Sequence, residues 1–254
     1  MPGKLADFLR IGHRGSCAEY PENTLVSFRR ALEQGAQMIE CDLQLTADGH
    51  VAVIHDWTLE RTSDGEGAVR ETSLADLQKL DAGSWKDPRF AGERIPTLDE
   101  TLDTVLPGGR LNLELKCRGS EEDARRLALS AVAAVSQRDA FDRVIFSSFD
   151  ATSLEALRDV SSEARIGVLW IFDPFDDAFA LADRLGAGAL HPRAEAVDVG
   201  VVEAARERGL AVNAWTVNEP AAMLDLVRTG VDGIISDYPG RLLEVRARLL
   251  GGEG

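Results

Sequence analysis

The sequence is poor in cysteine and in basic residues, and each shortage excludes a class of protein. Its three cysteines, Cys17, Cys41 and Cys117, cannot all pair internally and lack the spacing of a zinc knuckle, so we expect reduced thiols. Its 28 Lys and Arg residues are outnumbered by 43 Asp and Glu residues, which gives a net charge of −15. This charge disfavours broad contact with nucleic acid or an anionic membrane surface, so a small-molecule substrate fits better.

Long apolar runs are also missing. The first fifteen residues hold no apolar stretch long enough for a signal peptide, and no later segment reaches the length of a membrane span. We therefore expect a cytoplasmic protein without stable membrane association. The 254 residues, 44% of them hydrophobic, are enough for one large core, and we expect a single domain over 1–254. The oligomeric state stays open.

Short apolar runs alternate with stretches of helical periodicity, which predicts βαβ units around a parallel sheet. We expect helices over 25–34, 120–137, 153–160, 199–208 and 220–229, with Asp150 and Asn218 as capping residues. The strand candidates are FLRIGH, MIECDLQL, VAVIH, LNLELK, VIFSSF, IGVLW, GALHP, AVNAWT and GIISD.

These nine candidates are one more than an eight-stranded barrel requires. Only residues 47–50 (Ala-Asp-Gly-His) separate the second candidate from the third, and Asp-Gly between apolar runs is a strong hairpin signal. The third strand is then antiparallel to the second, and the other eight predict a closed (β/α)8 barrel. An open Rossmann-type sheet is the less economical alternative. If residues 47 and 50 pair, Asp42 stands opposite His55.

The barrel pattern lapses between residues 57 and 96. This stretch is polar and rich in Gly, Asp and Arg, with one predicted helix over 73–80. We interpret it as an inserted cap over the barrel mouth.

Three acidic residues are placed to share a cation. Glu40 and Asp42 lie two apart in one strand, so their carboxylates project from the same face, and Glu114 on the next barrel strand neighbours them. Carboxylates this close repel one another unless a hard cation lies among them, which predicts one divalent ion, Mg²⁺ or Ca²⁺. Salt bridges to neighbouring strands are the structural alternative.

Two histidines and two cations join these carboxylates at strand ends. His13 and Arg14 follow the first strand, and such a pair taken alone is equally typical of a structural histidine. Lys116 is long enough to reach a phosphate held by the metal, with Arg14 on the other side, although Lys116 can also be a simple counterion. With His55 from the hairpin, the set predicts a phosphoryl-transfer site.

Aromatic residues follow other strands. Phe149, Trp170 and Trp215 can form the wall of a pocket for a glycerol or choline group, or can pack beneath the insertion. We expect His50 and His191 to take no part in catalysis.

The motifs IGHRG, PENTLVSF, IECDLQLTADG, VIHD, IPTLDE, LNLELK, SSFD, AWTVN and ISDYP, in this order, resemble the glycerophosphodiester phosphodiesterase family over essentially the whole chain. The resemblance implies a phospholipase-C-like (β/α)8 barrel. It also implies hydrolysis of glycerophosphodiesters such as glycerophosphocholine or glycerophosphoethanolamine to sn-glycerol 3-phosphate and an alcohol. By matching position it implies an acid/base pair (His13 and His55), metal ligands (Glu40, Asp42 and Glu114), phosphate-binding residues (Arg14 and Lys116), residues at the edge of the substrate site (Glu22 and Asn23) and a residue supporting His55 (Asp56).

Within this reading we expect His13 to be the general base and His55 the general acid, because carboxylates next to His55 favour its charged form. A route through a cyclic phosphate formed by the glycerol 2-hydroxyl is equally compatible with the sequence. A lysophospholipase D is the alternative enzyme, although residues 62–94 show no obvious apolar lip. A Schiff-base lyase using Lys116 is disfavoured because nearby carboxylates stabilise the protonated amine. A non-enzymatic barrel that binds a phosphorylated metabolite is the remaining alternative.

Overall fold

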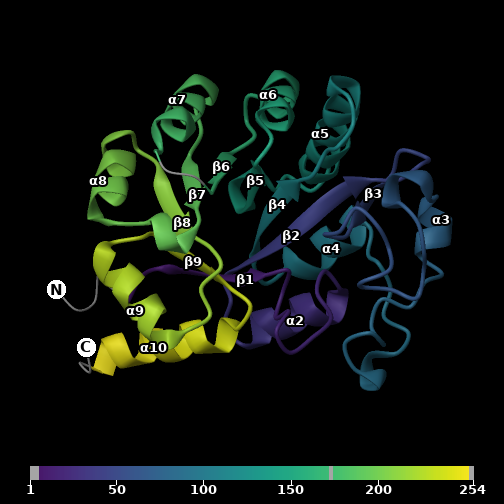
Figure 1. The fold of residues 1–254 in the computed structure, drawn as a ribbon, viewed down its shortest axis with the longest axis horizontal. Helices are drawn as coiled ribbons and strands as arrows, with labels where there is room; N and C mark the ends of the chain where they lie inside the picture. Colours follow the sequence, from purple (N-terminus) through teal and green to yellow (C-terminus); the bar gives the residue numbers. More distant parts are fainter. Residues whose placement is uncertain (1–5, 172–173, 252–254) are drawn as a thin grey trace.

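Eight parallel strands close into a barrel in the computed structural model, which describes residues 6–171 and 174–251. The first strand pairs with both the second and the last, which closes the ring, and helices surround it (Figure 1). The predicted (β/α)8 barrel is confirmed, and the open sheet is excluded. The barrel strands are β1 (Leu9–His13), β2 (Met38–Leu45), β4 (Arg110–Leu115), β5 (Val144–Ser148), β6 (Ile166–Trp170), β7 (Ala189–Pro192), β8 (Ala211–Ala214) and β9 (Gly233–Ser236).

Capping residues start several of the surrounding helices. Asp150 accepts hydrogen bonds from two backbone N–H groups of α6, as predicted. Asn218 is not a cap: Glu219 precedes α9, and the Asn218 amide donates to Asp237 instead, because the end of β9 lies beside it. The helices around the barrel are α2 (Leu25–Glu33), α4 (Leu98–Val105), α5 (Glu121–Ser136), α6 (Ala151–Val160), α7 (Asp176–Leu185), α8 (Val199–Glu207), α9 (Pro220–Thr229) and α10 (Pro239–Gly251), with short 3-10 turns η3 (Phe141–Arg143) and η4 (Ala194–Ala196).

The main core lies between the barrel and these helices. In β2 the outward residues Ile39, Cys41 and Leu43 are fully buried, while Glu40 and Asp42 point inward. Because both faces of each strand are covered, the strands appear in the sequence as continuous apolar runs. The barrel interior is closed below the polar residues by a small apolar cluster: Ile11, Met38, Ile145, Ala189 and Ile235.

The predicted hairpin forms with a different register. β3 (Val51–Val53) runs antiparallel to β2, but Thr46 pairs with His50 across a three-residue loop that ends at Gly49. Gly49 has φ +79°, the left-handed conformation that closes such loops. Ile54, rather than His55, therefore bonds to the Asp42 backbone, and the predicted Asp42–His55 pairing is wrong by one residue. His55 still reaches the site because the strand ends at Val53.

Residues 57–96 pack around a second apolar cluster, which includes Leu59, Val69 and Leu77 together with Ala52 and Ile54 from the hairpin. They contain η1 (Val69–Glu71), α3 (Leu74–Leu77), shorter than the predicted helix, and η2 (Pro88–Phe90). Figure 1 shows this segment along one side of the barrel, next to β3 and α4. Within the described residues, no helix is both long and apolar enough to cross a bilayer.

Candidate active site

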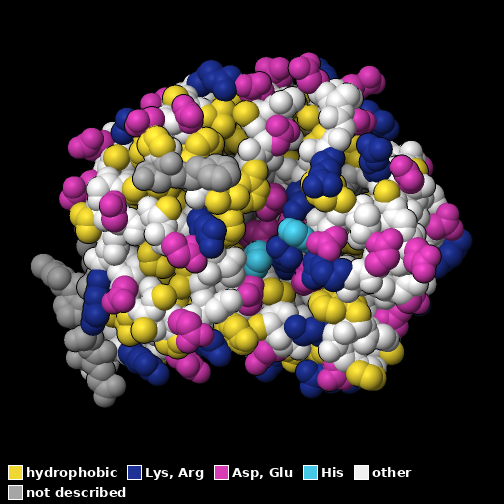
Figure 2. Space-filling model, viewed as in Figure 1, with side chains coloured by type: hydrophobic (Ala, Val, Ile, Leu, Met, Phe, Trp, Pro, Cys, Tyr) yellow, Lys and Arg dark blue, Asp and Glu magenta, His cyan; other side chains and the backbone are white. Residues whose placement is uncertain are grey.

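The side chains singled out from the sequence gather at the carboxyl ends of β1, β2 and β4. The parallel register sets His13 beside Glu40 and Asp42 beside Glu114. Figure 2 shows histidine and acidic side chains in a hollow near the middle of this face, with Lys and Arg side chains at its edge. A cavity of about 260 Å³ lies here, and its lining includes His13, Arg14, Glu40, His55 and Glu114.

The three predicted metal ligands lie together. Glu40, Asp42 and Glu114 each place a carboxylate oxygen within 4.8 Å of the others. Arg14 Nε is 3.3 Å and Lys116 Nζ 3.5 Å from Asp42, so protein cations neutralise part of this charge. Nevertheless, Glu40 Oε1 and Asp42 Oδ1 are buried and accept no hydrogen bond from any residue the structure describes. Two buried carboxylate oxygens that accept no hydrogen bond, one of them with only the ion pair to Lys116, fit a hard divalent cation better than a salt-bridge network.

Crowding of these acids changes their protonation. Burial, with Asp42 and Glu114 close by, raises the pKa of Glu40 well above its usual range. Burial and Asp42 raise the pKa of Glu114 to about 8. Burial opposes the shift at Asp42, but Arg14 and Lys116 lower the pKa of Asp42 to about 2. Without a cation the protein therefore favours the ionised form of Asp42 and the neutral form of Glu40 and Glu114.

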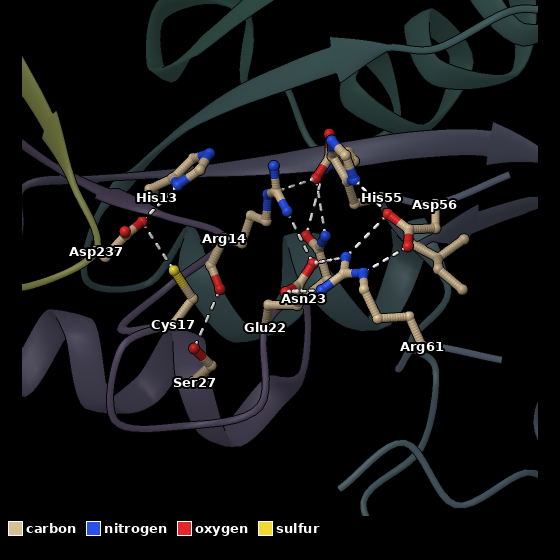
Figure 3. A network of polar contacts seen from close by, with 12 residues as sticks. His13, Arg14, Cys17, Glu22, Asn23, Ser27, His55, Asp56, Arg61 and Asp237 are labelled. Atoms are coloured by element: carbon tan, nitrogen blue, oxygen red, sulfur yellow. Dashed lines mark hydrogen bonds and ion pairs between the residues drawn. The ribbon is translucent and has the colours of Figure 1, made fainter. Parts of the chain in front are cut away.

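Each histidine is held by a carboxylate on the same ring nitrogen (Figure 3). His13 Nδ1 lies 2.6 Å from Asp237 Oδ1, and His55 Nδ1 lies 2.6 Å from Asp56 Oδ1. With Nδ1 engaged, Nε2 of each ring remains for proton transfer in the cavity that both histidines line. The contact of Asp56 with His55 is the one the sequence suggested.

The prediction that neighbouring carboxylates keep His55 charged is wrong. Burial lowers the pKa of His55, and Arg14 and Lys116 lower it further. These effects outweigh Asp42 and Asp56, which raise it. His13 also has a carboxylate partner, so neighbouring acids do not show which histidine is the general acid and which the general base. These roles have to be assigned from the positions of the two side chains.

Asp237, at the end of β9, was not identified from the sequence. Besides His13 it accepts hydrogen bonds from Cys17 Sγ at 3.0 Å and from Asn218 Nδ2 at 2.7 Å. The residue stands in the ISDYP motif directly after the last strand. In a closed barrel the last strand lies next to the first. An acidic residue directly after the last strand could therefore have been predicted to lie near His13.

Arg14 is fixed at the edge of the cavity by backbone and side-chain contacts. Its φ is +50°, its N–H donates to Glu40 Oε2 at 3.0 Å, and its guanidinium donates to Glu22 at 2.8 Å. Gly15 makes this turn possible: its φ is +90°, and an added Cβ would lie 2.7 Å from the backbone of Ser27.

Glu22 and Asn23 support other site residues. Glu22 also binds Arg61 of the 57–96 segment, with Arg61 Nη1 2.8 Å from Glu22 Oε2. Arg61 in turn contacts Asp56, and sequence reasoning did not identify this bridge. Asn23 Nδ2 donates to Asp42 Oδ2 at 2.8 Å. These two residues therefore orient Arg14 and Asp42 from the side of the cavity.

Two of the three aromatic candidates line the cavity. Phe149 and Trp215 pack edge to face with ring centroids 5.4 Å apart. Trp170 packs against the main core and does not line it. His191 is fully buried between Asn213 and Asn112 inside the barrel, and His50 is exposed beside the hairpin loop, so neither reaches the cavity.

Known proteins with related sequences match this chain over most of its length. The family model described as "Glycerophosphoryl diester phosphodiesterase family" matches residues 13–241. The chain belongs to this family. It is an enzyme that cleaves glycerophosphodiesters, so the resemblance inferred from the motifs is confirmed and the non-enzymatic alternative is excluded.

Individual relatives cover nearly the whole chain. A glycerophosphodiester phosphodiesterase of Caldanaerobacter subterraneus is 38% identical over 93% of this chain and 97% of its own length. One from Bacillus subtilis is 30% identical over 94% of this chain and 86% of its own length. Among solved structures, an Oleispira antarctica phosphodiesterase in complex with the product sn-glycerol-3-phosphate has a TM-score of 0.87 and 33% identity, over 94% of this chain and 96% of that one.

Proposed function

We propose that this family member uses one Mg²⁺ or Ca²⁺ ion to hydrolyse glycerophosphodiesters such as glycerophosphocholine and glycerophosphoethanolamine, releasing sn-glycerol 3-phosphate and the free alcohol. The observation that carries the proposal is the pair of buried carboxylate oxygens on Glu40 and Asp42 that accept no hydrogen bond, beside a cavity lined by two histidines. The product bound in the Oleispira structure is the product that this reaction yields.

The cation site consists of Glu40, Asp42 and Glu114. A divalent ion held there would neutralise phosphate charge and polarise a phosphoryl oxygen. Arg14 and Lys116, held against Asp42 from two sides, bind the remaining phosphate oxygens. Of the two groups considered for the wall of Phe149 and Trp215, we place the glycerol there.

The two histidines move protons at opposite ends of the phosphodiester. Figure 3 shows His13 and His55 on either side of Arg14, and this placement suits proton transfer at both ends of an in-line displacement. His13 Nε2 takes the proton of the attacking water or glycerol hydroxyl. His55 lies near Lys116 and two residues before Trp57, and we place the departing alcohol on this side of the phosphate. His55 Nε2 then protonates the departing alcohol. Asp237 and Asp56 act as positioning residues, since each fixes one imidazole through Nδ1.

A lysophospholipase D is the second candidate. Phe149 is 44% exposed and Ile171 is 37% exposed, and both line the cavity, so they offer apolar surface to an acyl chain.

The cellular setting follows from composition. The three cysteines are unpaired, which supports a reducing compartment, and we place the enzyme in the cytoplasm. The net charge of −15 supports a small-molecule substrate rather than nucleic acid or membrane as the partner.

A panel of glycerophosphodiesters assayed with Mg²⁺, Ca²⁺ and Mn²⁺ tests the proposal through release of glycerol 3-phosphate. Chelation should abolish turnover, and Glu40→Gln should lower kcat/KM at least about 100-fold because it removes one of the three ligands. Glu203→Gln, on the exposed face of α8, is the matched control and should behave as wild type. Full activity after exhaustive chelation, or in folded Glu40→Gln, would refute metal dependence.

A further inference from the structure

A second cavity lies next to the catalytic centre. It has a volume of about 690 Å³ and lies between the hairpin, the 57–96 segment and the loop from β4 to α5. Lys116 belongs to its lining and is also 3.5 Å from Asp42, so this groove begins where the phosphate would be held. The cavity with Phe149 and Trp215 is smaller, about 260 Å³, and shares no lining residue with this groove.

The groove is positively charged in a strongly acidic protein. Its lining holds two acids and four cations, Arg70, Lys116, Arg118 and Arg126, which gives the lining a net charge of +2. One of these acids, Asp123, already accepts hydrogen bonds from Ser120 as part of the α5 cap. Figure 2 shows Lys and Arg side chains between the histidines and the surface over α5. A cleft with one sign of charge concentrates ligands of the opposite sign.

Arg118 is the cation best placed for a ligand. Its guanidinium lies 4.7 Å from the centre of the Trp57 ring, while Lys116 Nζ lies 5.6 Å from the same ring. Across residues 6–171 and 174–251, no hydrogen bond or ion pair engages the Arg118 side chain. A guanidinium oriented by stacking, with its N–H donors unused, is suited to bidentate binding of a phosphate or carboxylate.

We infer that this groove binds the leaving alcohol, and that Arg118 on Trp57 recognises an anionic group carried by that alcohol. The inference rests on the proposed function and narrows its substrate class. The enzyme prefers glycerophosphodiesters whose second alcohol bears a phosphate or carboxylate, and it cleaves choline esters less efficiently. Water adds to phosphorus, the bond to the second alcohol breaks, and the proton needed by the alkoxide comes from His55.

Three substrates that differ in the charge of the leaving alcohol test this. They are 1,3-bis(glycero-3-phospho)glycerol, with an anionic leaving alcohol, glycerophosphoglycerol, with a neutral one, and glycerophosphocholine, with a cationic one. Wild type should favour the anionic over the cationic substrate at least about tenfold in kcat/KM, which corresponds to about 1.4 kcal/mol. The preference should weaken between low and high salt, because exposed charges are screened.

Substitutions test whether Arg118 causes the preference for an anionic leaving alcohol. Arg118→Gln should lower the anionic-to-cationic ratio of kcat/KM about tenfold, and Arg118→Glu should reverse the order. Arg125→Gln is the matched control, because it removes one exposed positive charge from the same part of the chain outside the groove, and it should keep the wild-type ratio.

The outcomes separate this inference from the proposed function. Hydrolysis of all three substrates with a ratio that Arg118→Gln leaves within about twofold of wild type overturns the groove assignment alone. Equal or faster cleavage of the choline ester by wild type does the same. If wild type with Mg²⁺ or Ca²⁺ hydrolyses none of the three, the proposed function fails and the inference fails with it.

Discussion

Replacing Asp237 with Asn is the sharpest perturbation that the site offers. Three donors converge on the Asp237 carboxylate: His13 Nδ1 and Cys17 Sγ on Oδ1, and Asn218 Nδ2 on Oδ2. Asn218 cannot rotate freely to adapt, since its own Oδ1 accepts from the Asp237 backbone and from Ser236. An amide at position 237 therefore places an NH2 group against at least one donor.

The expected loss of kcat in Asp237→Asn follows from the contact between residue 237 and His13. If the new NH2 group faces the imidazole, His13 has to carry its proton on Nε2, and this nitrogen can no longer act as a base. If the amide oxygen faces the ring, a charge-assisted hydrogen bond becomes a neutral one. Hydrogen bonds to charged groups are worth about 1.5–3 kcal/mol. We therefore expect kcat to fall about 10- to 100-fold, at about 1.36 kcal/mol for each tenfold.

Steady-state kinetics with a double-mutant cycle separates positioning from general loss of structure. Asp237→Asn should cost less than about threefold in a His13→Ala background, because the partner it orients is already gone. Cys17→Ser keeps a donor to Oδ1 and serves as the matched control, with kcat within about threefold of wild type. A folded Asp237→Asn variant that keeps more than half of wild-type kcat, or losses that simply multiply in the double variant, would refute the reasoning.

The remaining predictions concern the histidines, the inserted segment and a buried histidine. With a choline ester both His13→Ala and His55→Ala should lose about 10²–10⁴-fold, whereas with a p-nitrophenyl ester only His55→Ala should recover much of its rate; recovery by His13→Ala would reverse the two roles. Replacing residues 67–89 with a short linker should change relative rates among glycerophosphodiesters, and unchanged relative rates would contradict a cap that selects substrate. Burial lowers the pKa of His191 to about 4, so the folded state stays unprotonated while the unfolded chain gains a proton below roughly pH 6.5. Stability is therefore lost as pH falls from about 6.5 towards 4, by about 2 kcal/mol between pH 7 and pH 5. In urea titrations His191→Gln should lose less over that interval, and equal losses would argue against this linkage.

The hairpin shows that local sequence can predict an element of the site without predicting its register. The Asp-Gly signal identified the hairpin, but a two-residue and a three-residue loop share that signal. The loop adopted, with Gly49 in the left-handed conformation, shifts pairing by one residue and places Ile54 where His55 was expected. His55 nevertheless joins the site, because β3 ends at Val53 and the chain then bends toward Arg14 and Lys116.

The sequence by itself determined the strands, the barrel and the three carboxylates, because these depend on short-range periodicity. Strand alternation places Glu40 and Asp42 on one face, and strand order places Glu114 beside them. Only the tertiary structure decided which residues complete the site. Asp237 lies 224 positions from His13 and reaches it through closure of the ring between β1 and β9, while Arg118 stacks on Trp57 from a different loop. Such contacts depend on how separate elements meet in space, so a local pattern can mark a candidate residue such as Asp237 but does not identify its partner.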